Sequence, residues 1–137
     1  MQCWNALLSK IVNIDKTPKV LILNFDWYNR ENFTHHLDPV KFKHRIDIAE
    51  YCVSTNENET TYYLYGVIEH SGMVSQSNFI CFFRDFTVEE SWFKYLGEGR
   101  VIWTNSIEMR ENSKVYILFY LRKDVITWLK IIQSHAL

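Results

Sequence analysis

Two apolar runs joined by a short polar connector constrain the fold of this chain most strongly. Residues 62–69 are dense in aromatic and β-branched side chains, and residues 79–83 form a continuous apolar run. Both compositions are typical of β-strands. The connector, residues 71–77, consists largely of small and polar side chains, which is typical of a turn or loop. The sequence therefore predicts a β-hairpin here, and the rest of the chain is organised around it.

Four other segments also have strand character. Residues 20–23 are a continuous apolar run, which favours a strand buried on both faces. Residues 40–48 alternate between apolar and charged side chains, as in a half-buried strand. Residues 91–104 contain two strand-like runs around a Gly-Glu-Gly turn, which predicts a second hairpin. Residues 113–122 are rich in Val, Ile, Tyr and Phe and predict a further strand.

The two ends of the chain have helical periodicity. Residues 1–11 place apolar side chains on one helical face, and residues 123–137 do the same after Asp124, a predicted N-cap. We expect the C-terminal helix to pack on the sheet of its own domain, with another chain as the alternative cover. Residues 29–39 and 53–60 are polar and predict loops. The predicted binding residues of the C-terminal helix are Trp128, Leu129 and Ile132.

Taken together, these elements predict one α+β domain over residues 1–137, an antiparallel β-sheet with N- and C-terminal helices. The net charge of -1 gives no basic surface, so nucleic acid is not an expected partner. No run is long enough to span a membrane and no signal peptide is evident. Cys3, Cys52 and Cys81 stand at unrelated spacings, which favours reduced thiols in the cytoplasm or nucleus. Neither a metal nor another cofactor is expected, since adjacent His35 and His36 have no supporting ligand at helical spacing.

Residues 62–72, YYLYGVIEHSG, resemble the histidine box of the ubiquitin-specific proteases, in which YxLYAVxxHSG is followed by a Gly-rich linker and GHYxAYV. Four more segments between about residues 10 and 122 match the same family in the correct order. They are similar to the family's LPxVLxLHLKRF, LDLSxYC, WYxFDDxxV and SAYxLFYRR patterns. The resemblance implies the palm-like, C-terminal half of a papain-like protease fold, with residues 123–137 as an additional helix.

The resemblance also implies that the catalytic machinery is degenerate. The family histidine falls on Asn78, and the glycines before it are replaced by Gln76 and Ser77. The position of the orienting acid falls on Gly97, with Glu98 as the nearest carboxylate. The family's cysteine box is absent from the sequence. An asparagine has no titratable group near neutral pH and cannot shuttle a proton. We therefore predict a non-catalytic scaffold, a pseudo-deubiquitinase whose protein partner docks on the exposed aromatic face of the sheet or on the C-terminal helix.

Three alternatives remain open. One is weak ubiquitin binding without hydrolysis, in which Gln76 and Ser77 border the channel for the ubiquitin tail. Another is an active thiol isopeptidase, which uses Cys81 or Cys3 with His70 or is completed by another chain. The last is a sheet that stacks RNA bases on its aromatic side chains. The C-terminal helix also offers a surface through which the chain could form an oligomer.

Overall fold

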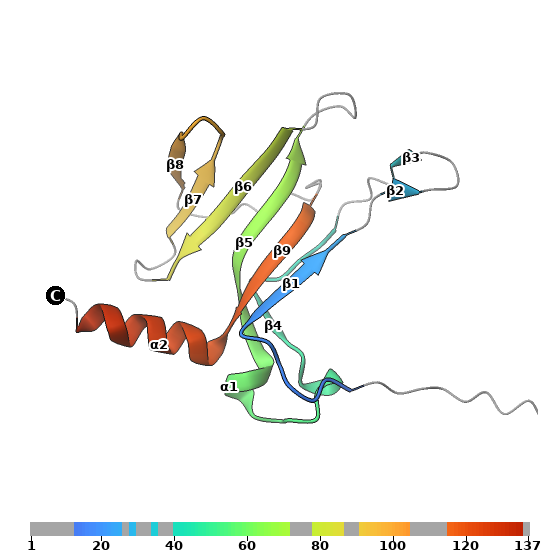
Figure 1. Ribbon diagram of the computed structural model, residues 1–137, viewed down its shortest axis with the longest axis vertical. Helices are drawn as coiled ribbons and strands as arrows, with labels where there is room; N and C mark the ends of the chain where they lie inside the picture. The colour runs from blue at the N-terminus through green and yellow to red at the C-terminus, as the bar shows by residue number, and fades with distance from the viewer. Residues whose placement is uncertain are drawn as a thin grey trace, which may run out of the picture.

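The computed structural model describes residues 13–25, 28–29, 34–35, 40–71, 78–86, 91–104 and 115–135. Its main element is a seven-stranded sheet in the order β1-β9-β5-β6-β7-β8, with β4 pairing separately with β5 (Figure 1). Every strand pair is antiparallel. The elements are β1 Val20–Asn24, β2 Tyr28–Asn29, β3 Thr34–His35, β4 Arg45–Asp47, the 3₁₀ turn η1 Ala49–Tyr51, α1 Glu57–Thr60, β5 Thr61–Ser71, β6 Asn78–Asp85, β7 Ser91–Tyr95, β8 Val101–Thr104, β9 Val115–Arg122 and α2 Lys123–Ser134. The α+β antiparallel class predicted from the sequence is confirmed.

One face of the sheet forms the hydrophobic core. The segment that leads into β4 covers this face, and Phe42 is its buried anchor. Full burial of each such apolar side chain stabilises the fold by about 1.5–3 kcal/mol. Two tyrosine hydroxyl groups of the sheet form hydrogen bonds to neighbouring segments of the chain. Tyr62 donates to the Pro18 carbonyl at 2.6 Å, and Tyr120 donates to the Lys43 carbonyl at 2.8 Å. The core residues of the sheet are Tyr62, Leu64, Val67, Phe82, Trp92, Val115, Leu118 and Tyr120.

The two predicted hairpins are present. Strands β5 and β6 pair from Gly66–Phe83 to Ser71–Asn78, and β7 and β8 pair across the Gly-Glu-Gly turn. In that turn Gly97, Glu98 and Gly99 all have positive φ, at 89°, 53° and 76°. Glycine adopts this left-handed backbone without a steric cost, so the turn depends on the two glycines.

Three sequence predictions require correction. Strand β1 is not buried on both faces, because it lies at the edge of the sheet and Ile22 is 56% exposed. Apolar and charged side chains do alternate in residues 40–48, but within this segment only β4 pairs with another strand. Residues 53–60 are not wholly a loop, since α1 forms there behind Asn56, whose side chain accepts from the Asn58 amide.

Two further predictions concern the N-terminal helix and the loop before β4. The predicted N-terminal helix over residues 1–11 lies outside the described residues. Part of the predicted loop over residues 29–39 is instead a short hairpin, formed by β2 and β3. The extent of the domain and its boundary at residue 122 remain predictions.

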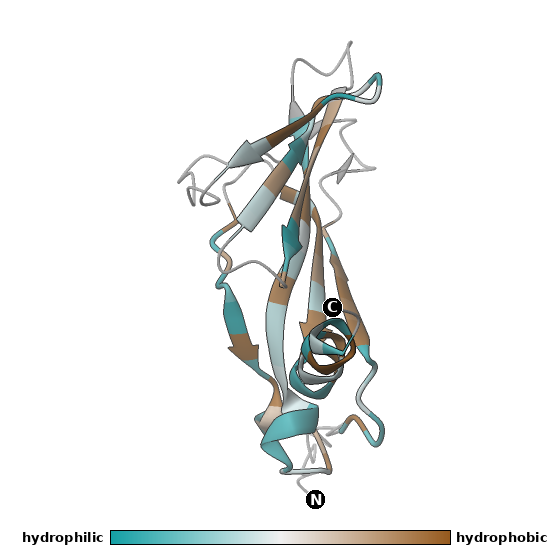
Figure 2. Cartoon of the chain, turned by 90° about the vertical axis from the view of Figure 1, so that its left-hand side faces the viewer, coloured by the Kyte–Doolittle hydropathy of each residue, from teal (hydrophilic) through white to brown (hydrophobic). Residues whose placement is uncertain are grey.

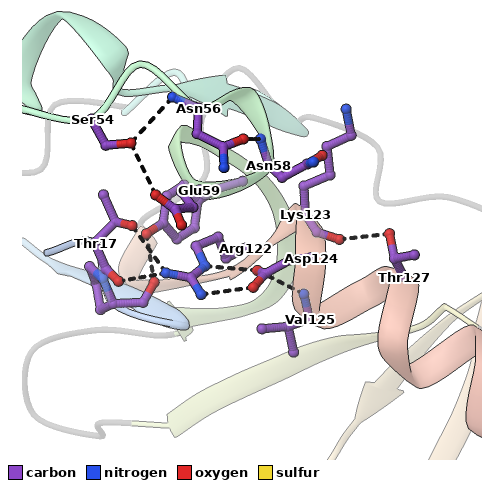
Figure 3. A network of polar contacts seen from close by, with 12 residues as sticks. Thr17, Ser54, Asn56, Asn58, Glu59, Arg122, Lys123, Asp124, Val125 and Thr127 are labelled. Carbon is purple, nitrogen blue, oxygen red and sulfur yellow. Dashed lines mark hydrogen bonds and ion pairs between the residues drawn. The ribbon is translucent and has the colours of Figure 1, made fainter.

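The start of α2 is tied to the sheet by Arg122 (Figure 3). Its guanidinium forms a bidentate pair with Asp124 at 2.7 and 2.8 Å and donates to the Thr17 carbonyl and hydroxyl at 2.8 and 3.1 Å. This pairing lowers the pKa of Asp124. The predicted N-cap was wrong by two residues, because Arg122 occupies the cap position and Asp124 lies inside the first turn. The ion pair fixes the direction in which α2 leaves β9.

Across the described part of the chain, none of the helices has the length and apolar character needed to cross a lipid bilayer.

Candidate functional site

The positions that correspond to the family's histidine and acid lie at the same end of the sheet. Asn78 is the first residue of β6, and Gly97 and Glu98 follow β7 directly. Strands β6 and β7 are antiparallel, and Cys81 pairs with Tyr95 at the end of their ladder. Continuing that register brings the start of β6 beside the turn after β7, and Figure 1 shows both at the upper end of the sheet. We call this region the upper corner.

The upper corner does not contain the groups of a thiol protease among the residues described. The residue at position 78 is an asparagine, and Glu98 is an exposed residue of the turn after β7. The nearby His70 ring packs edge-on against Phe79, with a centroid separation of 5.5 Å. Cys81, the cysteine of one alternative hypothesis, lies opposite Ile68 and Tyr95. No hydrogen bond joins Cys81 to His70 within the described residues.

Helix α2 presents part of its apolar surface to solvent. Ile126 is buried and Leu129 is half-buried, so one side of the helix packs on its own domain as predicted. The other side carries Trp128, Ile131 and Ile132, which are 59%, 52% and 43% exposed. Of the predicted binding residues, Trp128 and Ile132 are therefore accessible and Leu129 is partly covered. Ile131 completes this outward stripe, and the binding prediction did not include it.

A hollow of about 260 Å³ separates α2 from the sheet. Four of its nine lining residues are aromatic. Among them, the Phe86 ring stacks with Tyr65, and the Arg84 guanidinium carbon lies 4.8 Å from the Phe86 ring centroid. The full lining is Tyr65, Phe83, Arg84, Asp85, Phe86, Phe93, Leu129, Lys130 and Gln133. Helix α2 thus lies over one end of the sheet face that carries Phe83 and Phe93.

The face of the sheet opposite the core is also apolar. Residues paired directly across strands share a face, and two such rows run across the sheet without interruption. We call them the outer face. The first row is Ile22, Phe119, Gly66, Phe83, Phe93 and Trp103, and the second is Asn24, Ile117, Ile68, Cys81, Tyr95 and Val101.

The outer face is substantially accessible to solvent. Trp103 is 59% exposed, Val101 49% and Phe79 49%, and the Phe79 ring contacts Tyr116 at 5.6 Å. The sequence predicted an exposed aromatic face of the sheet, but it did not identify these residues as members of that face. The available signal was the run Val101 to Trp103, in which consecutive apolar residues must point to both faces of a strand.

Gln76 and Ser77, predicted to border a ubiquitin channel, lie outside the described residues. In the described part of the chain, no group of three or more His, Cys, Asp or Glu residues could hold a metal ion.

Comparison with known proteins identifies the family. The family model described as "Ubiquitin carboxyl-terminal hydrolase" matches residues 6–120. The chain belongs to the ubiquitin carboxyl-terminal hydrolase family. Ubiquitin carboxyl-terminal hydrolase 23 of Arabidopsis thaliana is 31% identical over 117 residues, which is 82% of this chain and 13% of that protein. Ubiquitin carboxyl-terminal hydrolase 1 of the same plant is 27% identical over 130 residues, 82% of this chain and 12% of that protein.

Solved structures with a similar fold include a multi-protein module. The Ubp8-Sgf11-Sgf73-Sus1 SAGA DUB module aligns with a TM-score of 0.64 and 26% identity, covering 80% of this chain and 25% of the matched chain. The same module bound to monoubiquitin also aligns with a TM-score of 0.64, at 27% identity, covering 80% of this chain and 24% of the matched one. This chain therefore spans about a quarter of the matched chain in those structures and about an eighth of the length of the curated relatives.

Proposed function

We propose that this family member acts as a non-catalytic scaffold, a protein-interaction module that operates in the cytoplasm or nucleus. The observation that carries the proposal is the outward stripe of α2, formed by Trp128, Ile131 and Ile132. Large apolar side chains that gather on one exposed helix face favour contact with another protein surface, and aromatic anchors contribute most of the binding energy at such contacts. The similar structures are multi-protein modules, which supports a role in assembly.

The absence of catalysis is part of the proposal. A thiol isopeptidase needs an imidazole that takes a proton from the cysteine and returns it to the leaving amine. The residue aligned with that imidazole is Asn78, which accepts and donates hydrogen bonds but does not titrate near neutral pH. Of the two described cysteines, Cys52 has its pKa raised, chiefly by burial, and this disfavours the nucleophilic thiolate.

Restoring the family histidine tests this view. We expect the Asn78→His variant to release no fluorophore from a ubiquitin C-terminal fluorogenic amide, as for the unmodified chain, because a base alone does not supply an activated thiol. The assay follows fluorescence over hours with an active ubiquitin carboxyl-terminal hydrolase as positive control. Turnover that disappears after iodoacetamide treatment would show that a cysteine is catalytic and that the chain is an enzyme.

Replacing the central residue of the stripe tests the scaffold role. The Trp128→Ser change should leave the free energy of unfolding within about 0.5 kcal/mol, because an exposed side chain contributes little to the fold. It should deplete the specific partner at least about tenfold in affinity purification from the native source, with quantitative mass spectrometry as readout. The matched control is Thr127→Ala, an exposed polar position on the same helix. Equal recovery of every co-purifying protein with both variants would contradict the proposal.

Ubiquitin binding without hydrolysis is the second candidate. It is favoured by the similarity to a module solved with monoubiquitin. An amide-shift titration of the isotope-labelled chain with free ubiquitin decides it, because even weak binding displaces resonances of the residues in contact. Unchanged spectra at millimolar ubiquitin would exclude this candidate and leave the scaffold role untouched.

A further inference from the structure

The outer face of the sheet is a second apolar surface, separate from the stripe on α2. Its two cross-strand rows join all six strands of the main path, from β1 at one edge to β8 at the other. None of the residues in these rows is charged. Figure 2, coloured by hydropathy, shows brown apolar segments along the strands above α2, which is seen end-on. Helix α2 approaches this face at one end, where Phe83 and Phe93 line the hollow together with Leu129, while Ile22, Tyr95, Val101 and Trp103 are exposed.

The packing within the face makes it a continuous surface. Gly66 lies in the middle of the first row, and the Phe119 ring occupies the space beside it, since a Cβ added at Gly66 would meet Phe119 Cδ2 at 3.4 Å. Phe83 and Phe93 stack next in the row, with centroids 5.3 Å apart and planes inclined by 16°. The accessible parts of this surface are ring faces and branched aliphatic groups.

The accessible area matches what a dimer needs. The face exposes aromatic side chains to between 37% and 59%, at Phe79, Phe83, Tyr95, Trp103 and Tyr116, together with Ile22 and Val101. Given 150–250 Å² for a whole aromatic side chain and about 150 Å² for an aliphatic one, these fractions amount to roughly 500–700 Å² of apolar surface. A standard protein interface buries about 800 Å² on each partner, and about 65% of a homodimer interface is apolar, which corresponds to roughly 500 Å² of apolar surface.

We propose that the outer face pairs with the outer face of a second copy of this chain, as a two-fold symmetric dimer. Two twisted antiparallel sheets pack face to face with their strands inclined by about 30°, and an apolar face without charge is complementary to itself in that arrangement. The chain as a whole has a net charge of -1, so electrostatic repulsion between two copies is small. The proposal does not depend on the scaffold role, which rests on α2.

Strand β8 offers a matched pair of variants that separates the two faces. Trp103 pairs with Phe93 on the outer face, whereas the adjacent Ile102 pairs with Lys94 on the opposite side. The two side chains are similarly exposed, at 59% and 51%, so a lysine at either position remains accessible to water. A change at Trp103 therefore tests the outer face, and the same change at Ile102 controls for the strand and its edge.

The experiment is sedimentation velocity on the full chain from about 1 to 200 μM, a range that brackets ordinary dimer affinities. We expect the unmodified chain to approach twice its 16.5 kDa mass and Ile102→Lys to behave likewise. Trp103→Lys should raise the dimer dissociation constant about 30-fold or more, as expected for the most exposed aromatic anchor of the face. Val101→Lys, on the same face, provides a second variant, and circular dichroism checks that each variant is folded.

Three results would overturn the proposal. The first is an unmodified chain that remains monomeric at 200 μM, which would leave the face to a different partner. The second is a dimer lost equally in Ile102→Lys and Trp103→Lys, which would point to edge-to-edge pairing of β8. The third is a dimer that survives both folded outer-face variants but is lost on Trp128→Ser, which would assign self-association to α2.

Discussion

Replacing Leu118 with alanine should lower the free energy of unfolding by about 2–5 kcal/mol, the range for a buried leucine whose removal leaves a cavity. Leu118 is 1% exposed and lies in β9, between Leu23 of β1 and Val67 of β5. It therefore contacts the core at the centre of the sheet, where the backbone of two neighbouring strands limits collapse around the lost side chain. A loss of this size is a large part of the stability of a typical domain.

Urea unfolding followed by circular dichroism measures this change, at one fixed protein concentration because self-association shifts apparent stability. The control is Ile131→Ala, a truncation of similar size at a site that is 52% exposed on α2. That change should shift the free energy of unfolding by no more than about 0.5 kcal/mol. Equal losses for the two variants would show that β9 is not central to the core.

The decrease in the free energy of unfolding at alkaline pH should depend on Tyr120. Burial raises its pKa from 10.0 to about 12, and the phenol can donate to the Lys43 carbonyl only while it keeps its proton. In the unfolded chain the phenol loses its proton near pH 10, whereas in the folded chain it keeps the proton. The stabilisation is therefore complete below pH 10 and is lost as the pH rises toward 12, by roughly 2–3 kcal/mol in total.

The Tyr120→Phe variant isolates this contribution from that of the other titrating groups. Near pH 7 it should be less stable by about 1 kcal/mol, because the partly buried hydrogen bond to the Lys43 carbonyl is lost. Between pH 10 and 12 the variant should lose less stability than the unmodified chain, so that the difference between them shrinks or reverses. Unfolding curves collected at intervals of half a pH unit provide the measurement. A constant difference across this range would mean that Tyr120 titrates normally in the folded state.

Much of the fold was accessible from local patterns. The hairpin of β5 and β6 and the glycine turn between β7 and β8 were predicted because strand composition and left-handed turn residues act over a few neighbours. The position of Asn78 at the start of β6 followed from the family resemblance, and the register then placed it beside the turn that contains Glu98. Local sequence did not reveal α1, since four residues with one N-cap side chain give a weak helical signal.

Burial was the property that the patterns predicted least well. Residues 20–23 were expected to be covered on both faces, yet β1 is an edge strand with Ile22 largely exposed. A continuous apolar run shows that a strand avoids charge, but not which neighbours cover it. The same limitation applies to Trp103 and Phe79, whose shared surface exists only once the strands are placed in order.

The sequence by itself determined the main hairpin strands, the C-terminal helix, the family and the asparagine at the histidine position, because each depends on residue type and short spacing. Only the tertiary structure decided which apolar side chains remain accessible. Pairing β1 with β9 and β7 with β8 aligns residues from distant segments into rows on one face, and the covering segment around Phe42 occupies the other. Exposure is a property of these long-range neighbours, so no local pattern specifies it.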